Sequence, residues 1–221
     1  MPDLPETIEL ETGPDPDACV IWMHGLGADG SDFVPIVPEL DLPPRAIRFV
    51  FPHAPMQPVT INSGYVMRAW YDVVATDFGR QEDESGVRAS RELIEGLLAR
   101  EKERGIAAEN IVLAGFSQGG AMALFTGLRH DERLAGIMAL SSYLPIAASL
   151  AGEAHEANRG VPIFMAHGTE DEIVPIALAR MSRNHLVGLG YASEWHEYPM
   201  PHSVCAEEID DISAWLTLTL G

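Results

Sequence analysis

Short runs of consecutive apolar residues recur along the chain, separated by stretches in which apolar positions return every three or four residues. Uninterrupted runs are typical of strands in a parallel sheet, because such strands are buried on both faces. We predict strands at residues 19–23, 47–51, 111–116, 136–140 and 161–166, a weaker last strand at 193–198 and an edge strand at 8–11. Helices are predicted at 85–104, 118–129, 175–189 and 204–218. This alternation predicts an α/β protein with a mostly parallel sheet and helices on both faces.

Single residues mark where some of these helices should begin and end. Ser85 is placed to cap the helix at 85–104, and Gly105 is placed to end it. Pro175 suits the first turn of the helix at 175–189, where its missing N–H costs nothing.

Residues 53–84 break the alternation, because about thirty residues without clear periodicity join a strand to a helix. The segment is nevertheless rich in apolar side chains, which argues for order. We expect short strands folded over the carboxyl edge of the sheet.

Composition narrows the class of protein. The 221 residues show no change of composition or linker, so we predict a single domain over residues 1–221. No apolar run approaches the roughly 18 residues of a membrane-spanning helix, so stable membrane insertion is not expected. Residues 1–13 carry acids and prolines instead of a secretion signal, and we predict a cytoplasmic protein in which Cys19 and Cys205 are free thiols.

The formal net charge is −19, from 33 acidic and 14 basic residues. No stripe of Lys and Arg is present that could neutralise phosphates. Nucleic acid and anionic membrane surfaces are therefore poor partners, and the acid excess is typical of a solvated surface.

Candidate chemistry is concentrated at residues 115–119, Gly-Phe-Ser-Gln-Gly. This G-x-S-x-G sequence follows a predicted strand and precedes a predicted helix, which is the setting of the nucleophile elbow in the α/β-hydrolase fold. Gly115 and Gly119 would relieve collisions at so sharp a turn. We therefore predict Ser117 as the nucleophile of a serine hydrolase.

A serine nucleophile needs a base and an acid that orients the base, and in this fold both follow the serine in the order acid, then histidine. His202 lies in a loop bounded by prolines just before the last predicted helix, and it is the predicted base. The acid is predicted in the loop after the strand at 161–166, which offers Glu170, Asp171 and Glu172. Asp171 is favoured, although the chemistry of the loop alone leaves all three open.

The oxyanion hole needs two backbone N–H donors, one after the nucleophile and one from the loop after an early strand. Gln118 and Leu26 meet these requirements. The sequence at residues 25–30 also reads G-x-G-x-x-G, which is a dinucleotide-binding fingerprint. Pro35 and Pro38 would interrupt the long helix that a nucleotide site requires, so this alternative is less favoured.

A metal site is a second alternative. Four histidines, His24, His53, His167 and His202, follow predicted strands and could converge at one edge of the sheet to bind zinc. They form no local H-x-x-x-H pair, and a zinc site would leave the serine motif without a role. We therefore expect His24 and His167 to hold loop backbones by hydrogen bonds.

Several further motifs accompany the elbow: His24-Gly-Leu-Gly, Pro52-His-Ala-Pro, Ala69-Trp-Tyr-Asp, Gln81-Glu-Asp-Glu-Ser-Gly, His167-Gly-x-x-Asp-x-x-Val-Pro and His202-Ser. Together they resemble the family of small bacterial carboxylesterases that includes the eukaryotic acyl-protein thioesterases. The resemblance implies a triad of Ser117, Asp171 and His202, and it selects Asp171 over its acidic neighbours. It also implies no cofactor and a homodimeric assembly.

The same resemblance implies an oxyanion hole from Leu26 and Gln118, and an apolar acyl site at Leu26, Val73, Val74, Tyr143 and Ile173. The predicted function is a serine carboxylesterase that hydrolyses short- to medium-chain acyl esters through an acyl-enzyme at Ser117. The alternatives are acyl-protein thioesterase or lysophospholipase activity on the same triad, and a non-catalytic α/β-hydrolase binding module. The connection at 140–161 is too short for a lid domain, which predicts an open site.

Overall fold

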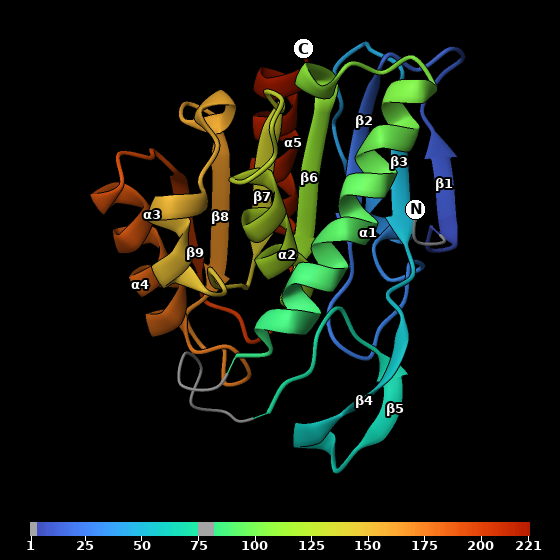
Figure 1. Cartoon of the computed structure of the whole chain (residues 1–221). Helices are drawn as coiled ribbons and strands as arrows, with labels where there is room; N and C mark the ends of the chain where they lie inside the picture. Colours follow the sequence, from blue (N-terminus) through green and yellow to red (C-terminus); the bar gives the residue numbers. More distant parts are fainter. Residues whose placement is uncertain (1–3, 75–81) are drawn as a thin grey trace.

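The computed structural model describes residues 4–74 and 82–221 of the chain. Its centre is a seven-stranded sheet in the order β1-β3-β2-β6-β7-β8-β9 (Figure 1). The strands are β1 Thr7–Glu11, β2 Ala18–Met23, β3 Ile47–Pro52, β6 Ile111–Phe116, β7 Gly136–Leu140, β8 Ile163–Gly168 and β9 Glu194–Tyr198. All neighbours pair in parallel except β1, which runs antiparallel to β3 at the edge. The predicted α/β-hydrolase architecture is confirmed.

Helices cover both faces of the sheet, as the sequence predicts. They are α1 Glu84–Glu103, α2 Gln118–Gly127, α3 Leu150–Glu153, α4 Ile176–Gly188 and α5 Ala206–Leu220. Successive side chains of a strand point to opposite faces of the sheet and belong to two separate hydrophobic cores. Ile21 packs with α1 and α2 on one face, whereas Val20 packs with α5 on the other. The uninterrupted apolar runs follow from this burial on both sides.

The connection after β3 forms a two-stranded antiparallel hairpin of β4 Met56–Val59 and β5 Tyr65–Arg68. The hairpin lies beyond the carboxyl ends of the central strands (Figure 1), as predicted for the residues at 53–84. Residues 75–81 of this connection lie outside the described part of the chain. The motif that begins at Gln81 is therefore described only from Glu82 onward.

Several predicted boundaries were wrong; the last helix, for example, is Ala206–Leu220 instead of 204–218. Ser85 does not cap α1, because the carboxylate of Asp83 accepts the N–H of Gly86 at 2.9 Å and also that of Asp72 at 2.9 Å. Strand β8 runs from Ile163 to Gly168 instead of 161–166, since Pro162 has no N–H to donate to a ladder. Pro175 precedes α4 as its N-cap residue and does not lie within its first turn.

Other local predictions are confirmed. Gly105 follows α1 with φ of 97°, a left-handed conformation in which glycine has no steric penalty. Cys19 and Cys205 are free, and Cys19 is buried.

Candidate active site

Ser117 occupies the turn between β6 and α2 in a strained backbone conformation. Its φ of 53° and ψ of −118° lie outside the regions that side-chain-bearing residues ordinarily adopt. The turn is held from both sides: the N–H of Ser117 donates to Leu140 O at 2.8 Å, and the Ser142 hydroxyl donates to Ser117 O at 2.7 Å. Ser142 is buried in the segment after β7, and the sequence does not reveal its contact with the turn.

The two glycines of the motif are required by close backbone approach. A Cβ atom on Gly115 would lie 2.2 Å from the carbonyl carbon of Gly119. A Cβ atom on Gly119 would lie 2.2 Å from the carbonyl oxygen of Met23, at the end of β2. The elbow therefore packs against both itself and the neighbouring strand, with no room for a side chain at either position.

His202 and Asp171 form a hydrogen-bonded pair. The Nδ1 atom of His202 lies 2.6 Å from Oδ2 of Asp171, whose side chain is fully buried. The other carboxyl oxygen of Asp171 accepts the N–H groups of Ile173 at 2.9 Å and Val174 at 2.8 Å. Because an ionised carboxylate only accepts hydrogen bonds, His202 carries its proton on Nδ1, and Nε2 is left free to accept one.

The imidazole of His202 is positioned beside the elbow. Its ring packs against Phe116, the residue before Ser117, with 4.7 Å between ring centroids. The loop that carries His202 is also bonded to the acid loop, since Thr169 N–H donates to Tyr198 O at 2.8 Å and Glu170 N–H donates to Met200 O at 3.1 Å. Glu170 and Glu172, the alternative acids, are exposed.

Three of the four histidines of the alternative metal site are bonded to backbone groups, whereas the fourth, His202, pairs with the carboxylate of Asp171. His24 donates from Nδ1 to Gly25 O at 2.7 Å and accepts the Ala54 N–H on Nε2 at 3.0 Å. His53 accepts the N–H of Gly30, and His167 donates from Nε2 to Val174 O at 2.7 Å. Burial lowers the pKa values of His24 and His167, which favours their neutral forms. His24 and His167 fix loop backbones, as expected.

The residues predicted to supply the oxyanion donors, Leu26 and Gln118, line one cavity together with Ser117. Gln118 begins α2, where the first N–H groups of a helix have no partner within the helix. Leu26 lies in the loop after β2, and no hydrogen bond involving its N–H is found within the described residues. The next residue, Gly27, has φ of 77° and donates to Arg68 O in the hairpin at 2.9 Å. A helix of the kind a dinucleotide site needs does not follow, since residues after this loop form only the 3-10 turn Val34–Glu39.

The side chain of Gln118 has a structural role that sequence reasoning missed. Its Oε1 accepts the N–H of Trp70 at 2.7 Å, and its Nε2 donates to Tyr71 O at 2.7 Å. Trp70 in turn donates from its indole N–H to His24 O at 3.0 Å. The elbow, the oxyanion loop and the connection at 53–84 are therefore joined by buried hydrogen bonds. The motif Ala69-Trp-Tyr-Asp was the available signal for this connection.

A cavity of about 310 Å³ opens beside Ser117. Its lining includes four of the predicted acyl-site residues, Leu26, Val73, Tyr143 and Ile173, together with Ser117 and Gln118. Val74 is not part of this lining, and its side chain is 39% exposed. The assignment of Val74 to the acyl site stays a prediction. Sequence reasoning did not place Ile61, Asn62, Tyr71, Glu172 or Val174 in this cavity.

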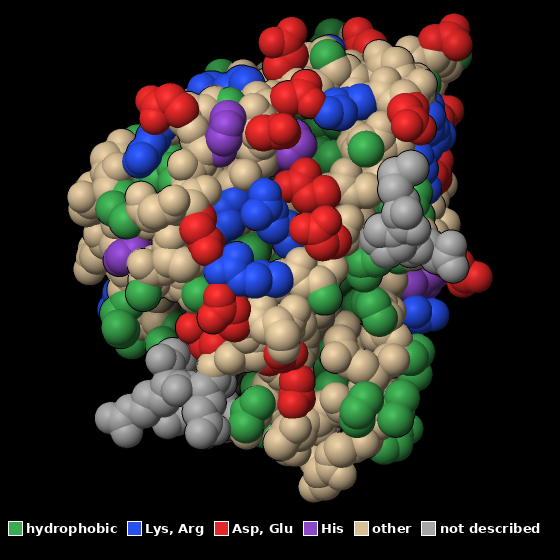
Figure 2. All heavy atoms as spheres, viewed as in Figure 1, with side chains coloured by type: hydrophobic (Ala, Val, Ile, Leu, Met, Phe, Trp, Pro, Cys, Tyr) green, Lys and Arg blue, Asp and Glu red, His purple; other side chains and the backbone are tan. Residues whose placement is uncertain are grey.

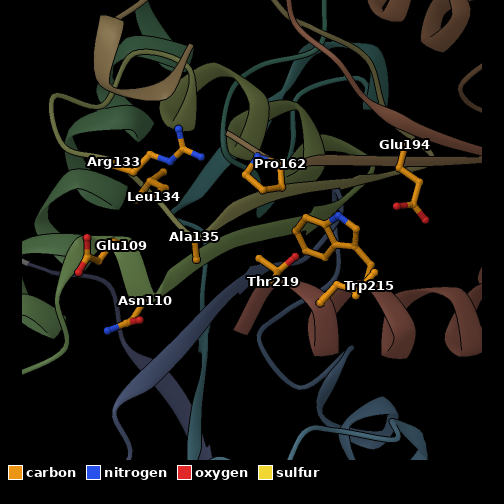
Figure 3. A pocket seen from close by; sticks show the side chains of 10 residues that line it. Glu109, Asn110, Arg133, Leu134, Ala135, Pro162, Glu194, Trp215 and Thr219 are labelled. Carbon is orange, nitrogen blue, oxygen red and sulfur yellow. The ribbon is translucent and has the colours of Figure 1, made fainter. Parts of the chain in front are cut away.

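A larger hollow of about 600 Å³ lies at the opposite edge of the sheet. Figure 3 shows its lining at the amino ends of the strands, with Trp215 and Thr219 projecting from α5 and Ala135 and Pro162 close to the starts of β7 and β8. None of the candidate catalytic residues reaches it.

Charged side chains alternate in sign on the face shown in Figure 2. Arg88 pairs with Glu84 and Glu153, and Arg129 also pairs with Glu153. These cations are neutralised within the protein, in agreement with the expectation that nucleic acid is not a partner. No helix within residues 4–74 and 82–221 is both long and apolar enough to cross a membrane.

The fold and the site together define a serine hydrolase of the α/β-hydrolase class. The chain matches the phospholipase/carboxylesterase family model over residues 7–220 and belongs to that family. The resemblance inferred from the motifs is thereby confirmed.

The curated relatives include fungal enzymes. The chain is 43% identical to acyl-protein thioesterase 1 of Neurospora crassa over 210 residues, which cover 90% of this chain and 86% of the relative. It is 39% identical to acyl-protein thioesterase 1 of Gibberella zeae, with 90% of this chain and 89% of the relative covered.

Solved structures agree with this assignment. Arabidopsis thaliana SOBER1 superimposes with a TM-score of 0.87 at 31% identity, covering 92% of this chain and 99% of that one. Zea mays acyl-protein thioesterase 2 gives a TM-score of 0.85 at 26% identity, covering 98% of this chain and all of that one.

Proposed function

We propose that Ser117, His202 and Asp171 hydrolyse short- to medium-chain acyl esters through an acyl-enzyme. The observation that carries this proposal is the hydrogen bond between His202 and the buried carboxylate of Asp171, formed beside a cavity that Ser117 lines. His202 takes the proton of the Ser117 hydroxyl as the oxygen attacks the ester carbonyl. The N–H groups of Leu26 and Gln118 hold the resulting oxyanion.

In the second half of the reaction, water attacks the acyl-enzyme and His202 again transfers the proton. Asp171 stays ionised throughout, because its role is to hold the Nδ1–H tautomer of His202 and to stabilise the imidazolium cation. The reaction needs no cofactor.

Thioester hydrolysis by the same three residues is the second candidate function. Fungal relatives named as acyl-protein thioesterases support it. Lysophospholipid hydrolysis would use the same steps with a different leaving group.

The test is a panel of matched acyl esters and acyl thioesters assayed with the wild type and with Ser117→Ala. We expect Ser117→Ala to lose several orders of magnitude in kcat on every substrate while it stays folded. Hydrolysis by Ser117→Ala at near wild-type rates would overturn the assignment. A chelator should leave activity unchanged, whereas loss and recovery with zinc would favour the histidine metal site.

Three further properties are proposed from the sequence: one domain over residues 1–221, a homodimeric assembly and a cytoplasmic location. Light scattering of the purified protein tests the assembly, and fractionation of the source cells tests the location. An open site without a lid should show no large gain on emulsified long-chain triglyceride relative to soluble short esters.

A further inference from the structure

Tyr143 lines two separate cavities. On one side it borders the cavity of about 310 Å³ that contains Ser117. On the other side it borders a second cavity of about 270 Å³, which lies between the segment after β7 and helix α4. The lining of the second cavity is mostly apolar and comprises Glu82, Leu144, Ala147, Ala148, Leu178, Met181, Ser182 and His185.

Hydrogen bonds hold Tyr143 in this position. Its hydroxyl lies 2.9 Å from that of Tyr71, a buried residue whose carbonyl accepts the Gln118 side chain. Ser142, the residue before Tyr143, donates its hydroxyl to Ser117 O, and the N–H of Leu144 after it donates to Ser182 Oγ at 2.8 Å. Burial raises the pKa of Tyr143 to about 12, so the phenol stays neutral and hydrogen-bonded at physiological pH.

We propose that the side chain of Tyr143 is the partition between the two cavities and thereby limits the length of the acyl chain that the enzyme accepts. This inference rests on the proposed function, because it assigns the chain-length specificity of the same site.

The physical argument compares apolar burial on the two sides of Tyr143. An ester substrate binds more tightly as the methylenes of its acyl chain enter the first cavity, by about fourfold for each methylene buried. Where the chain reaches the ring of Tyr143, the ring closes the cavity, so a further methylene buries no more apolar surface and gains nothing. The second cavity offers Leu144, Leu178 and Met181 to a longer chain once the ring of Tyr143 is removed.

The experiment measures kcat/KM for p-nitrophenyl esters from butanoyl to hexadecanoyl, below the concentration at which each ester aggregates. For the wild type we expect kcat/KM to rise with chain length and then stop rising. For Tyr143→Ala we expect the maximum to move to longer chains, and the ratio of long-chain to butanoyl kcat/KM to rise about tenfold or more. Tyr143→Leu, which removes the ring with less loss of packing, should move the maximum in the same direction.

Two matched variants test whether the ring of Tyr143, and not its hydroxyl or a general loss of packing, sets the chain-length maximum. Tyr143→Phe keeps the ring and loses the hydroxyl, so its maximum should stay at the wild-type chain length. Ala148 is an exposed residue of the second cavity, and Ala148→Trp in the Tyr143→Ala background should return the maximum towards the wild-type length.

The inference is overturned if Tyr143→Ala and Tyr143→Leu hydrolyse butanoyl ester in a Ser117-dependent manner with the wild-type chain-length profile. Failure of the proposed function gives a different result, namely a wild-type protein that hydrolyses none of the esters in a Ser117-dependent manner.

Discussion

The Nδ1 atom of His202 lies 2.6 Å from Oδ2 of Asp171, although 31 positions of the chain separate the two residues. The bond joins the loop after β8 to the loop after β9, and it fixes the tautomer that leaves Nε2 of His202 able to accept a proton. Ser117, Asp171 and His202 follow β6, β8 and β9. These strands are parallel and end at the same edge of the sheet, so three residues far apart in the sequence lie at one edge.

Asp171→Asn should therefore disable the base without disturbing the fold. The amide can donate a hydrogen bond to His202, which would favour the wrong tautomer, and kcat should fall on the order of 10³- to 10⁴-fold. The measurement is steady-state hydrolysis of a soluble short-chain ester. The control is Glu170→Gln, which removes an exposed acid from the same loop and should stay within a few fold of the wild type. Equal losses in the two variants would contradict the assignment of Asp171.

Gly119→Ala should prevent stable folding, because its Cβ atom would lie 2.2 Å from the backbone oxygen of Met23 and neither chain segment can move away. We expect a loss of several kcal/mol of unfolding free energy, or no soluble protein. Gly188→Ala is the control, since no atom lies within 4 Å of its Cβ position at the end of α4. It should stabilise the protein by about 0.5 kcal/mol or change little. Denaturant unfolding of both variants checks this, and a well-folded Gly119→Ala protein would be inconsistent with the elbow geometry.

Gln118→Ala should destabilise the site through the connection at residues 53–84. It leaves the Trp70 N–H and the Tyr71 carbonyl without their partner, at a cost of about 1 to 3 kcal/mol for each group. For a chain of this size, the loss of both partners corresponds to a fall in Tm of roughly 4 to 24 °C. Gln57→Ala removes one hydrogen bond, to Ala69 O, from the same connection and should cost less. A larger effect from Gln57→Ala would show that the Gln118 side chain is not what holds this segment.

Glu208 should make stability decline as pH rises. Its carboxyl oxygens are buried and make no hydrogen bond of good geometry within the described residues. Burial raises its pKa from 4.5 to about 8; the nearby backbone of Cys205 lowers the pKa in part, and the charge of Asp211 raises it further. Between pH 4.5 and about 8, Glu208 is therefore protonated in the folded state and ionised in the unfolded state. The unfolding free energy falls as the pH rises through this range, by up to a few kcal/mol.

Glu208→Gln should remove most of this decline, measured as Tm at pH 5 and pH 8.5. Glu207→Gln makes the same charge change at an exposed neighbour and should keep the wild-type pH dependence. A wild-type Tm that rises from pH 5 to pH 8.5 in parallel with that of Glu208→Gln would refute the role of Glu208.

The sequence predicted elements best where burial alone determines them. Strands β6 and β7 match the predicted residues 111–116 and 136–140 because every position in them is apolar or glycine and both faces are covered. The capping residue of α1 was predicted wrongly. The carboxylate of Asp83, which caps the helix, is also held by the N–H of Asp72, a contact across the connection at 53–84. Periodicity carries no information about such a contact.

The candidate site also contains features that the sequence predicts and features that depend on contacts between distant residues. The positions of Ser117 and His202 relative to the strands followed from the motif and from the order of residues along a parallel sheet, whereas the choice of Asp171 over Glu170 and Glu172 came from the family resemblance. The buried bonds from Gln118 to Trp70 and Tyr71, and the separation of two cavities by Tyr143, depend on side chains far apart in the sequence.

Covalent labelling with a fluorophosphonate probe, followed by peptide mass spectrometry, tests whether Ser117 is the nucleophile of a serine hydrolase. We predict a single adduct on Ser117, which is formed by the wild type, strongly slowed by Asp171→Asn and absent from Ser117→Ala. An unlabelled wild-type protein, as expected of a non-catalytic binding module, or an adduct on another serine that survives in Ser117→Ala, would contradict this role of Ser117.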